Sequence, residues 1–464
     1  MLKSQTIQAV LEHALHLGAD FAELFMEDCE ETSIDYDGAV GGIAQQRTSG
    51  VGINVFAGKR STYVYTNDQT ESSLLQTVKR AAAILGLTGN GSAQLLPPKA
   101  LEIANPCPVL VYPSTVQHQD KIAILREADC AARAVTSSLR GIKLTYFDRD
   151  QTVHVVNTEG TDAHDRRVTT RLRYIPLIEN EHGAASRFSD FAVAAGFEAL
   201  SGGAYIPHMT RFIREMESVL TAADAPSARV PVILEAGSCT GVFFHEACGH
   251  QLETNTLKDK GLFWDRRGAQ IASPKVTLID DGTMPGMYAS SRIDDEGMPR
   301  QKNTLIENGI LKGFFVDRLG ALQLGLAPTG SGRRQNYKYA PAARMSNTYL
   351  AAGQDDEDAM IRDTPEGLFV TAIGGGTGGR EFTLMAETAY WIKNGKIDRQ
   401  VKGAMLSGRG DETMLKIDRV GKTVIAEDGG GSFCGATSGF CANTASGPRI
   451  RIAEMLVGGK GGLG

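Results

Sequence analysis

Apolar positions in the first half of the chain follow two different periods. Spacings of three and four residues predict helices, the first starting near Ile7 and ended by Gly18. Alternation of apolar and polar residues predicts short strands. Strands are expected at 21–26, 32–36, 51–56, 61–65, 143–147, 152–157 and 169–176. Further helices are expected from a cap at Asp68 or Thr70 to Leu85, at 119–135 and at 211–220.

The second half of the chain carries more strand signals. A strand at 230–234 is followed by a helix that bears His245. Asn308-Gly309 and Asn394-Gly395 each separate two apolar runs, a pattern typical of tight hairpins. Short helices are expected at 317–324, 355–362 and 412–420.

A small, polar stretch at 222–228 separates these two patterns. The sequence therefore predicts an α+β protein with two domains. The first, at 1–222, is a mixed N-terminal domain of helices and strands, and the second, at 229–464, is mainly antiparallel β and carries the helix with His245.

Composition narrows the class of partner. The chain has 464 residues, 42% hydrophobic and 22% charged, with a net charge of −6 and no basic stripe, which argues against nucleic acid. No apolar run is long enough to span a bilayer, so no membrane is expected. The seven cysteines are odd in number and scattered, as in reduced proteins of the cytoplasm. We therefore expect a cytoplasmic protein.

The segment His245-Glu246-Ala247-Cys248-Gly249-His250 carries the most specific chemical signal in the chain. Two imidazoles can bind a metal, and a carboxylate next to a ligand can act as a base toward a metal-bound water. The histidines are five positions apart, which places them roughly 140° apart on an ideal helix. Both can reach one metal only through a π-bulge or an unwinding at Gly249. The alternative is a pair of hydrogen-bonded core histidines.

A third ligand would decide between these interpretations. Cys248 lies inside the motif, but its position on a regular helix favours a core role. Cys434 and Cys441 lie in a glycine-rich terminal segment that can reach the histidines. Either would give two histidines, one cysteine and an open position, the arrangement of a catalytic zinc site. Composition does not choose between them.

These residues resemble the TldD/PmbA metalloproteases. The stretch His245–Glu253 is similar to the His-Glu-x-x-x-His signature of that family, and the similarity extends over nearly the whole chain. In the family, a cysteine in a Cys-Gly segment before a proline and a Val-Gly-Gly ending completes the zinc site. Cys434-Gly435, Pro448 and Val457-Gly458-Gly459 match that layout, so the resemblance assigns the third ligand to Cys434 and leaves Cys441 as a weaker candidate. The intact motif resembles the active, TldD-type subunit.

The resemblance implies a zinc-dependent peptidase for unfolded peptides bound in extended form in a narrow cleft. His245, His250 and Cys434 would bind one zinc ion, and Glu246 would be the base toward the attacking water. Arg344 and Asn347 are candidates for binding the substrate backbone or the oxyanion, or for structural hydrogen bonds in a turn. Glu253 is a candidate to orient His250, or an ordinary helix carboxylate.

Two other functions remain open. One is a non-catalytic regulatory or binding subunit of a TldD/PmbA-type complex, which would bind no metal. The other is a zinc amidohydrolase for a small molecule, which would need a closed pocket in place of a cleft. The family forms two-subunit assemblies, so a homodimer or a heterodimer with a PmbA-like subunit is expected.

Overall fold

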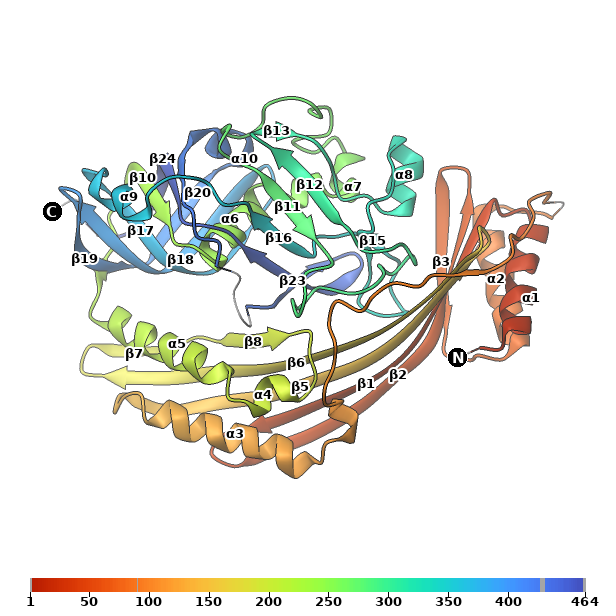
Figure 1. Ribbon diagram of the computed structural model, residues 1–464, viewed down its shortest axis with the longest axis horizontal. Helices are drawn as coiled ribbons and strands as arrows, with labels where there is room; N and C mark the ends of the chain where they lie inside the picture. Colours follow the sequence, from red (N-terminus) through yellow and green to blue (C-terminus); the bar gives the residue numbers. More distant parts are fainter. Residues whose placement is uncertain (1, 90, 426–429, 462–464) are drawn as a thin grey trace.

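A long antiparallel sheet carries the first half of the chain and curves beneath the second half (Figure 1). The computed structural model describes residues 2–89, 91–425 and 430–461. The sheet is built on β1 (Phe21–Tyr36), β2 (Val40–Ala57), β5 (Leu139–Asn157) and β6 (Thr161–Asn180). Its order is β3-β2-β1-β5-β6-β4, with β3 at Arg60–Thr66 and β4 at Lys99–Ala100. The short β7 (Gly183–Ser186) and β8 (Ser189–Val193) both pair with β6.

The strands of this sheet are longer than the sequence predicts. The expectation of two strands at 21–26 and 32–36 is wrong, because β1 runs without a break through Glu27–Glu31. The charged side chains of this middle part have partners on neighbouring strands: Asp28 is bound by Arg47 and Glu27 by Arg149. Ladder pairing on both sides and these ion pairs allow a polar segment to continue as a strand. The two strands predicted at 143–147 and 152–157 merge into β5 for the same reason, and the strand predicted at 169–176 lies within the longer β6.

Helices cover one face of this sheet in two separate groups. Near one end, α1 (Ser4–His16) and α2 (Glu71–Leu85) pack on apolar residues of β1 and β2 such as Leu24 and Ile53. Towards the other end, α3 (His118–Arg133) and α5 (Tyr205–Leu220) pack on Ile34 and Leu144. Figure 1 shows the two groups well apart along the strands. We call this the outer face. The residues that alternate with these along each strand lie on the other face of the sheet. Among them, Phe25 and Val153 face the second half of the chain and contact Ile293 and Tyr337.

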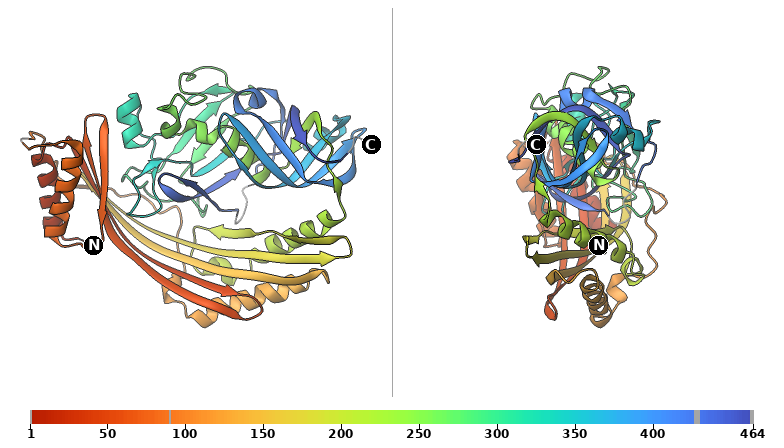
Figure 2. Two further views of the ribbon diagram at one scale, coloured as in Figure 1. Left: turned by 180° about the vertical axis from the view of Figure 1, so that it is seen from behind. Right: turned by 90° about the vertical axis from the view of Figure 1, so that its left-hand side faces the viewer.

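The second half is built on two sheets. In the first, the strands β17-β10-β24-β20-β18 form a closed ring, because β18 also pairs with β17. Their bounds are β10 (Ala228–Leu234), β17 (Glu366–Thr377), β18 (Glu381–Lys393), β20 (Ala404–Arg409) and β24 (Ile450–Gly458). The strand β9 (Ala223–Asp224) joins this sheet through β19 (Lys396–Lys402). Figure 2 shows the ring almost end on.

The second sheet has the order β13-β12-β11-β16-β23-β22. Its strands are β11 (Leu278–Asp281), β12 (Lys302–Glu307), β13 (Ile310–Leu311), β16 (Asn347–Leu350), β22 (Ser432–Ala436) and β23 (Gly439–Ser446). Both predicted hairpins are present, and Asn308 and Asn394 have the positive φ of 49° and 53° that such turns require. The mixture of helices and mainly antiparallel sheets confirms the predicted α+β class.

The short helices of the second half follow the sequence with one exception. Helices α8 (Arg318–Leu324) and α9 (Glu357–Arg362) occur where expected, each capped by an aspartate. The helix predicted at 412–420 is wrong in its second half. The chain forms α10 (Gly410–Thr413) and a 3₁₀ turn at Met414–Lys416, and then becomes β21 (Ile417–Val420). Ile417 and Val420 are buried in the pairing with β24, so sheet contacts override the helical spacing. None of the described helices combines the length and apolar character needed to cross a membrane.

Candidate metal centre

The helix that bears His245 and Glu246 is held tightly inside the second half. Helix α6 (Ser238–Ala247) packs its buried Phe243 and Phe244 into the main hydrophobic core. A side chain at Gly241 would meet the backbone of Ala445 on β23 at 2.1 Å, so glycine allows that close approach. The helix is therefore anchored against the same strand that pairs with the segment bearing Cys434.

The helix breaks between the two histidines. It ends at Ala247, Cys248 has φ −139° and ψ −47°, and His250 lies on a 3₁₀ turn at Gly249–Leu252. The residue after the break is a glycine, and a side chain there would lie 2.2 Å from the sulfur of Met345. Of the two distortions anticipated from the spacing, the structure has the unwinding, but at Cys248, one residue before the predicted Gly249. Cys248 is buried in the core, as predicted.

This break brings the three predicted ligands together. The His245 and His250 rings lie 4.7 Å apart between centroids at 85°. The Cys434 sulfur is 3.4 Å from Nε2 of His250, although the two residues are 184 positions apart. One ligand atom from each of the three residues lies within 4.8 Å of the others. Cys441 is directly opposite Cys434 in the β22–β23 ladder, but it is buried near Ser438, so the geometry favours Cys434.

The donors fit a zinc ion in kind. Burial is the main factor that lowers the pKa of His245 to about 3, so this imidazole is neutral and free to bind a cation. Burial also acts to lower the pKa of His250, but hydrogen bonds to Cys434 and Glu253 outweigh it and raise that pKa to about 10. A cation held between Nε2 and the sulfur would replace the proton of this hydrogen bond. Two imidazoles and one thiolate are a common zinc donor set.

Glu246 sits beside this cluster against a glycine-rich strand end. Burial raises the pKa of its carboxyl above the ordinary value of 4.5, while His250 opposes the shift. A side chain at Gly378 would lie 2.7 Å from Oε2 of Glu246, and one at Gly376 would lie 3.2 Å from its Cγ. These glycines therefore leave space for the carboxylate. The sequence does not identify these glycines as site residues. Its only signal is the high glycine content of this stretch, which indicates that the backbone comes close to another part of the protein.

Glu253 and Arg344 connect the two parts of the cluster. Oε2 of Glu253 is 3.5 Å from Nδ1 of His250, so the predicted orienting contact is present. The other carboxylate oxygen faces Nε of Arg344 at 3.6 Å. Arg344 donates to the carbonyl oxygen of Cys434 at 2.6 Å and to Ser438 and Gly439 at the turn of the same hairpin. Arg344 thus links Glu253, which contacts His250, to the backbone of Cys434.

Asn347 has a structural environment. Its amide nitrogen donates to the carbonyl oxygen of Asp281 and to the hydroxyl of Ser290, and its oxygen accepts from Ala289 and Thr444. Both amide hydrogens are donated within the fold. Asn347 therefore fits the alternative prediction, that it makes structural hydrogen bonds. Arg344 is likewise buried and bound to the hairpin, so neither side chain is placed to contact a substrate directly.

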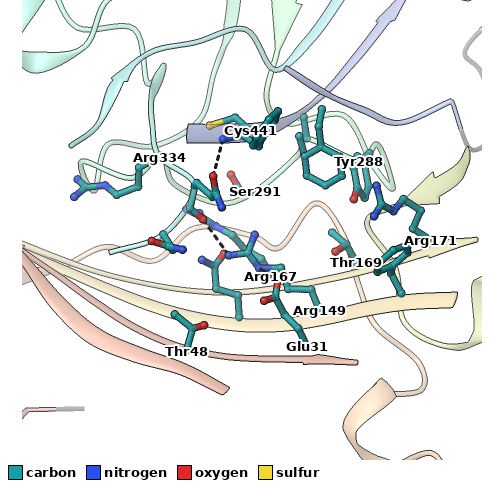
Figure 3. Close-up of a pocket in the computed structure, with 18 of the residues that line it drawn as sticks. Glu31, Thr48, Arg149, Arg167, Thr169, Arg171, Tyr288, Ser291, Arg334 and Cys441 are labelled. Atoms are coloured by element: carbon teal, nitrogen blue, oxygen red, sulfur yellow. Dashed lines mark hydrogen bonds and ion pairs between the residues drawn. The ribbon is translucent and has the colours of Figure 1, made fainter. Parts of the chain in front are cut away.

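A cavity of about 420 Å³ lies between the two halves of the chain (Figure 3). Glu31, Thr48, Arg149, Arg167, Thr169 and Arg171 come from the long sheet, and Tyr288, Ser291, Arg334 and Cys441 come from the second half. Phe433 and Phe440 of the β22–β23 hairpin also line it. The hairpin that carries Cys434 therefore forms part of the wall of this cavity between the two halves of the chain.

Three domain models of one known family match consecutive segments of the chain. The PmbA/TldA metallopeptidase domain 1 matches residues 22–85, the central domain matches 112–225 and the C-terminal domain matches 227–459. The metalloprotease TldD homolog of Haemophilus influenzae is 32% identical, over 99% of this chain and 97% of its own length. The metalloprotease TldD homolog of Buchnera aphidicola from Acyrthosiphon pisum is 31% identical, over 89% and 86%.

Solved structures share the fold at lower identity. A Thermotoga maritima protein described as a candidate modulator of a DNA gyrase matches with a TM-score of 0.77 and 18% identity, over 98% of this chain and 99% of its own. TldE from Thermococcus kodakarensis matches with a TM-score of 0.74 and 17% identity, over 97% and 99%. The full-length matches, together with the metallopeptidase domains along the chain, show that it belongs to the PmbA/TldA (TldD/PmbA) metallopeptidase family.

Proposed function

We propose that this chain is a zinc-dependent peptidase that hydrolyses peptide bonds of unfolded peptides bound in extended form. The observation that carries the proposal is the convergence of His245, His250 and Cys434, whose ligand atoms lie within 4.8 Å of one another. These three residues would hold one zinc ion. Three protein ligands leave a coordination position open, as in catalytic zinc sites.

Each residue of the site has a definite role in this proposal. A bound zinc ion supplies Lewis acidity toward water and the peptide carbonyl. Glu246 takes the proton of the attacking water on its carboxylate and passes it to the leaving amine. Glu253 holds His250 through Nδ1 so that Nε2 faces the metal position, and Arg344 fixes the hairpin of Cys434.

A free strand edge beside Glu246 supports an extended substrate. Beyond Val370, β17 continues to Thr377 and pairs with β18 on one side only, among the described residues, because β10 has ended at Leu234. The segment from Gly374 to Gly378 is exposed and borders Glu246. Main-chain groups of a peptide can pair with such an edge without regard to its side chains. This arrangement favours a peptide over a small-molecule amide.

The proposal includes a two-subunit assembly. The family resemblance implies either a homodimer or a heterodimer with a PmbA-like subunit, and TldE of Thermococcus kodakarensis has the same fold as this chain. A purely regulatory subunit would have no use for the converging donor set, so that alternative is not favoured.

The test uses the purified chain, stripped with a chelator and reloaded with zinc. A mixture of unfolded peptides is incubated with wild type, the stripped protein and Glu246→Gln, and the new termini are counted by mass spectrometry. Cleavage that depends on zinc and disappears in Glu246→Gln is expected. Equal cleavage by all three samples would refute the proposal.

A further inference from the structure

A second group of metal-binding side chains lies in the first half of the chain, on the outer face of the long sheet. It consists of His154 on β5 and of Asp162 and His164 on β6. One ligand atom from each of the three residues lies within 4.8 Å of the others. Apart from His245, His250 and Cys434, no other group of this kind is found among the residues that the structure describes.

The register of the sheet creates this group. His154 is directly opposite His164 in the antiparallel β5–β6 ladder, and Asp162 lies two positions before His164 on the same face. The two imidazole rings are stacked, with 3.7 Å between centroids. Both Nε2 atoms face one oxygen of Asp162, at 2.7 Å from His154 and 3.5 Å from His164. All three side chains thus direct a donor atom to one place.

The neighbouring charged side chain on this face does not compete for these donors. The nearest arginine along the strand on this face, Arg166, is bound by Asp150 and stacked on Tyr112. Within the described part of the chain, Asp162 has an ion-pair partner only in the two histidines.

The site is separate from the proposed catalytic centre. Val153, Val155 and Ala163, the neighbours of the two histidines, face the second half of the chain, so His154 and His164 lie on the opposite face. That face is covered by α1 and α2 near one end and by α3 and α5 near the other. His164 is 58% exposed, which gives an ion access from solvent.

We propose that His154, Asp162 and His164 form a second binding site for a divalent transition-metal ion, with zinc as the expected occupant. Two histidines and one carboxylate, with further positions open to water, are an established donor set for such ions. A bound ion would join β5 to β6 on the outer face of the sheet. This site does not depend on the proposed peptidase activity.

Zinc stoichiometry tests the proposal directly. The full-length chain is stripped, equilibrated with limiting free zinc and analysed for bound metal after gel filtration. Wild type is expected to retain about two zinc ions per chain, and His164→Ala and Asp162→Asn about one. Because His164 is exposed, the fold should survive its loss, which circular dichroism checks. His182→Ala, at another exposed histidine, is the matched control and should behave as wild type.

The same measurement on Cys434→Ser separates this site from the catalytic one. That variant should also keep about one ion, and the double variant with His164→Ala should keep none. With cobalt as the probe, the sulfur-to-metal absorption should disappear in Cys434→Ser and persist in His164→Ala. If His164→Ala and Asp162→Asn hold as much metal as wild type, the second site does not exist. If only Cys434→Ser leaves the metal content unchanged, the proposed catalytic centre fails and the second site stands.

Discussion

The sulfur of Cys434 lies 3.4 Å from Nε2 of His250, across 184 positions of sequence. The contact requires two separate features of the fold: a helix that breaks at Cys248 and the β22–β23 hairpin that carries Cys434. The close approach of Gly241 to β23 fixes the helix, and the hydrogen bond from Arg344 to the carbonyl oxygen of Cys434 fixes the hairpin.

Cys434→Ser should remove the catalytic metal while leaving the fold intact. A serine hydroxyl is a far poorer zinc ligand than a thiolate, and Cys434 is only partly buried, so little packing is lost. Zinc-dependent cleavage of unfolded peptides should fall below detection. Cys441→Ser, on the opposite strand of the same hairpin, is the matched control and should keep its activity. Equal loss in both variants would point to damage to the hairpin.

Glu246→Gln should abolish catalysis without loss of metal. An amide of the same shape cannot accept the proton of the attacking water, so kcat should fall by about 10²–10⁴-fold. Zinc content should equal that of wild type, because Glu246 is not among the three converging donors. A variant with normal turnover would remove Glu246 from the mechanism.

Activity should have an acid limb set by Glu246. Burial raises the pKa of this carboxyl above 4.5, so it becomes protonated at a higher pH than an exposed glutamate and stops acting as a base. The rate of cleavage should therefore fall as the pH is lowered, with a midpoint above 4.5. The measurement is kcat/KM against pH, with zinc content followed at each point. A midpoint at or below 4.5, with zinc retained, would contradict the assignment.

Gly378→Ala should impair catalysis more than stability. The new methyl group would lie 2.7 Å from Oε2 of Glu246 and 2.5 Å from its carbonyl oxygen, so the carboxylate must move. At least about a tenfold loss of kcat is expected, since small displacements of a catalytic group are costly. Gly141→Ala is the matched control, because a methyl group there meets nothing within 4 Å. Equal activity of the two variants would show that Gly378 plays no part in placing Glu246.

Arg344→Lys should weaken metal binding through the positions of Glu253 and Cys434. A lysine cannot reproduce the donors that reach the carbonyl oxygen of Cys434 and the turn at Ser438. Loss of such supporting contacts reduces metal affinity about 10–100-fold. Zinc affinity by competition with a chelator measures the effect. If the affinity is unchanged but KM rises sharply, Arg344 would instead be a substrate-binding residue.

Much of the fold can be predicted from local pattern, and the exceptions have a common cause. The helix of Ile7 and the hairpins at Asn308 and Asn394 appear as predicted because neighbouring residues decide them. Glu27 to Glu31 continue one strand, and Ile417 to Val420 form another, because distant partners pair with them. Pairing between distant segments is not visible in a local pattern.

In the candidate site, too, some features can be predicted from local sequence and others depend on contacts between distant segments. The histidines and Glu246 are marked by their spacing, and the choice of Cys434 over Cys441 comes from the family resemblance, which the geometry supports. The bond from Arg344 to the hairpin and the fit of Gly378 against Glu246 depend on tertiary contacts. The group of His154, Asp162 and His164 depends on the register of β5 and β6, which no single segment specifies.

X-ray absorption at the zinc edge tests the central claim most directly. The measurement uses the His164→Ala protein loaded with one equivalent of zinc, so that the catalytic site alone contributes. The account predicts one sulfur neighbour at about 2.3 Å together with nitrogen or oxygen neighbours at about 2.0–2.2 Å. The sulfur neighbour should vanish when Cys434→Ser is added. A shell of nitrogen and oxygen alone in the protein that retains Cys434 would contradict it.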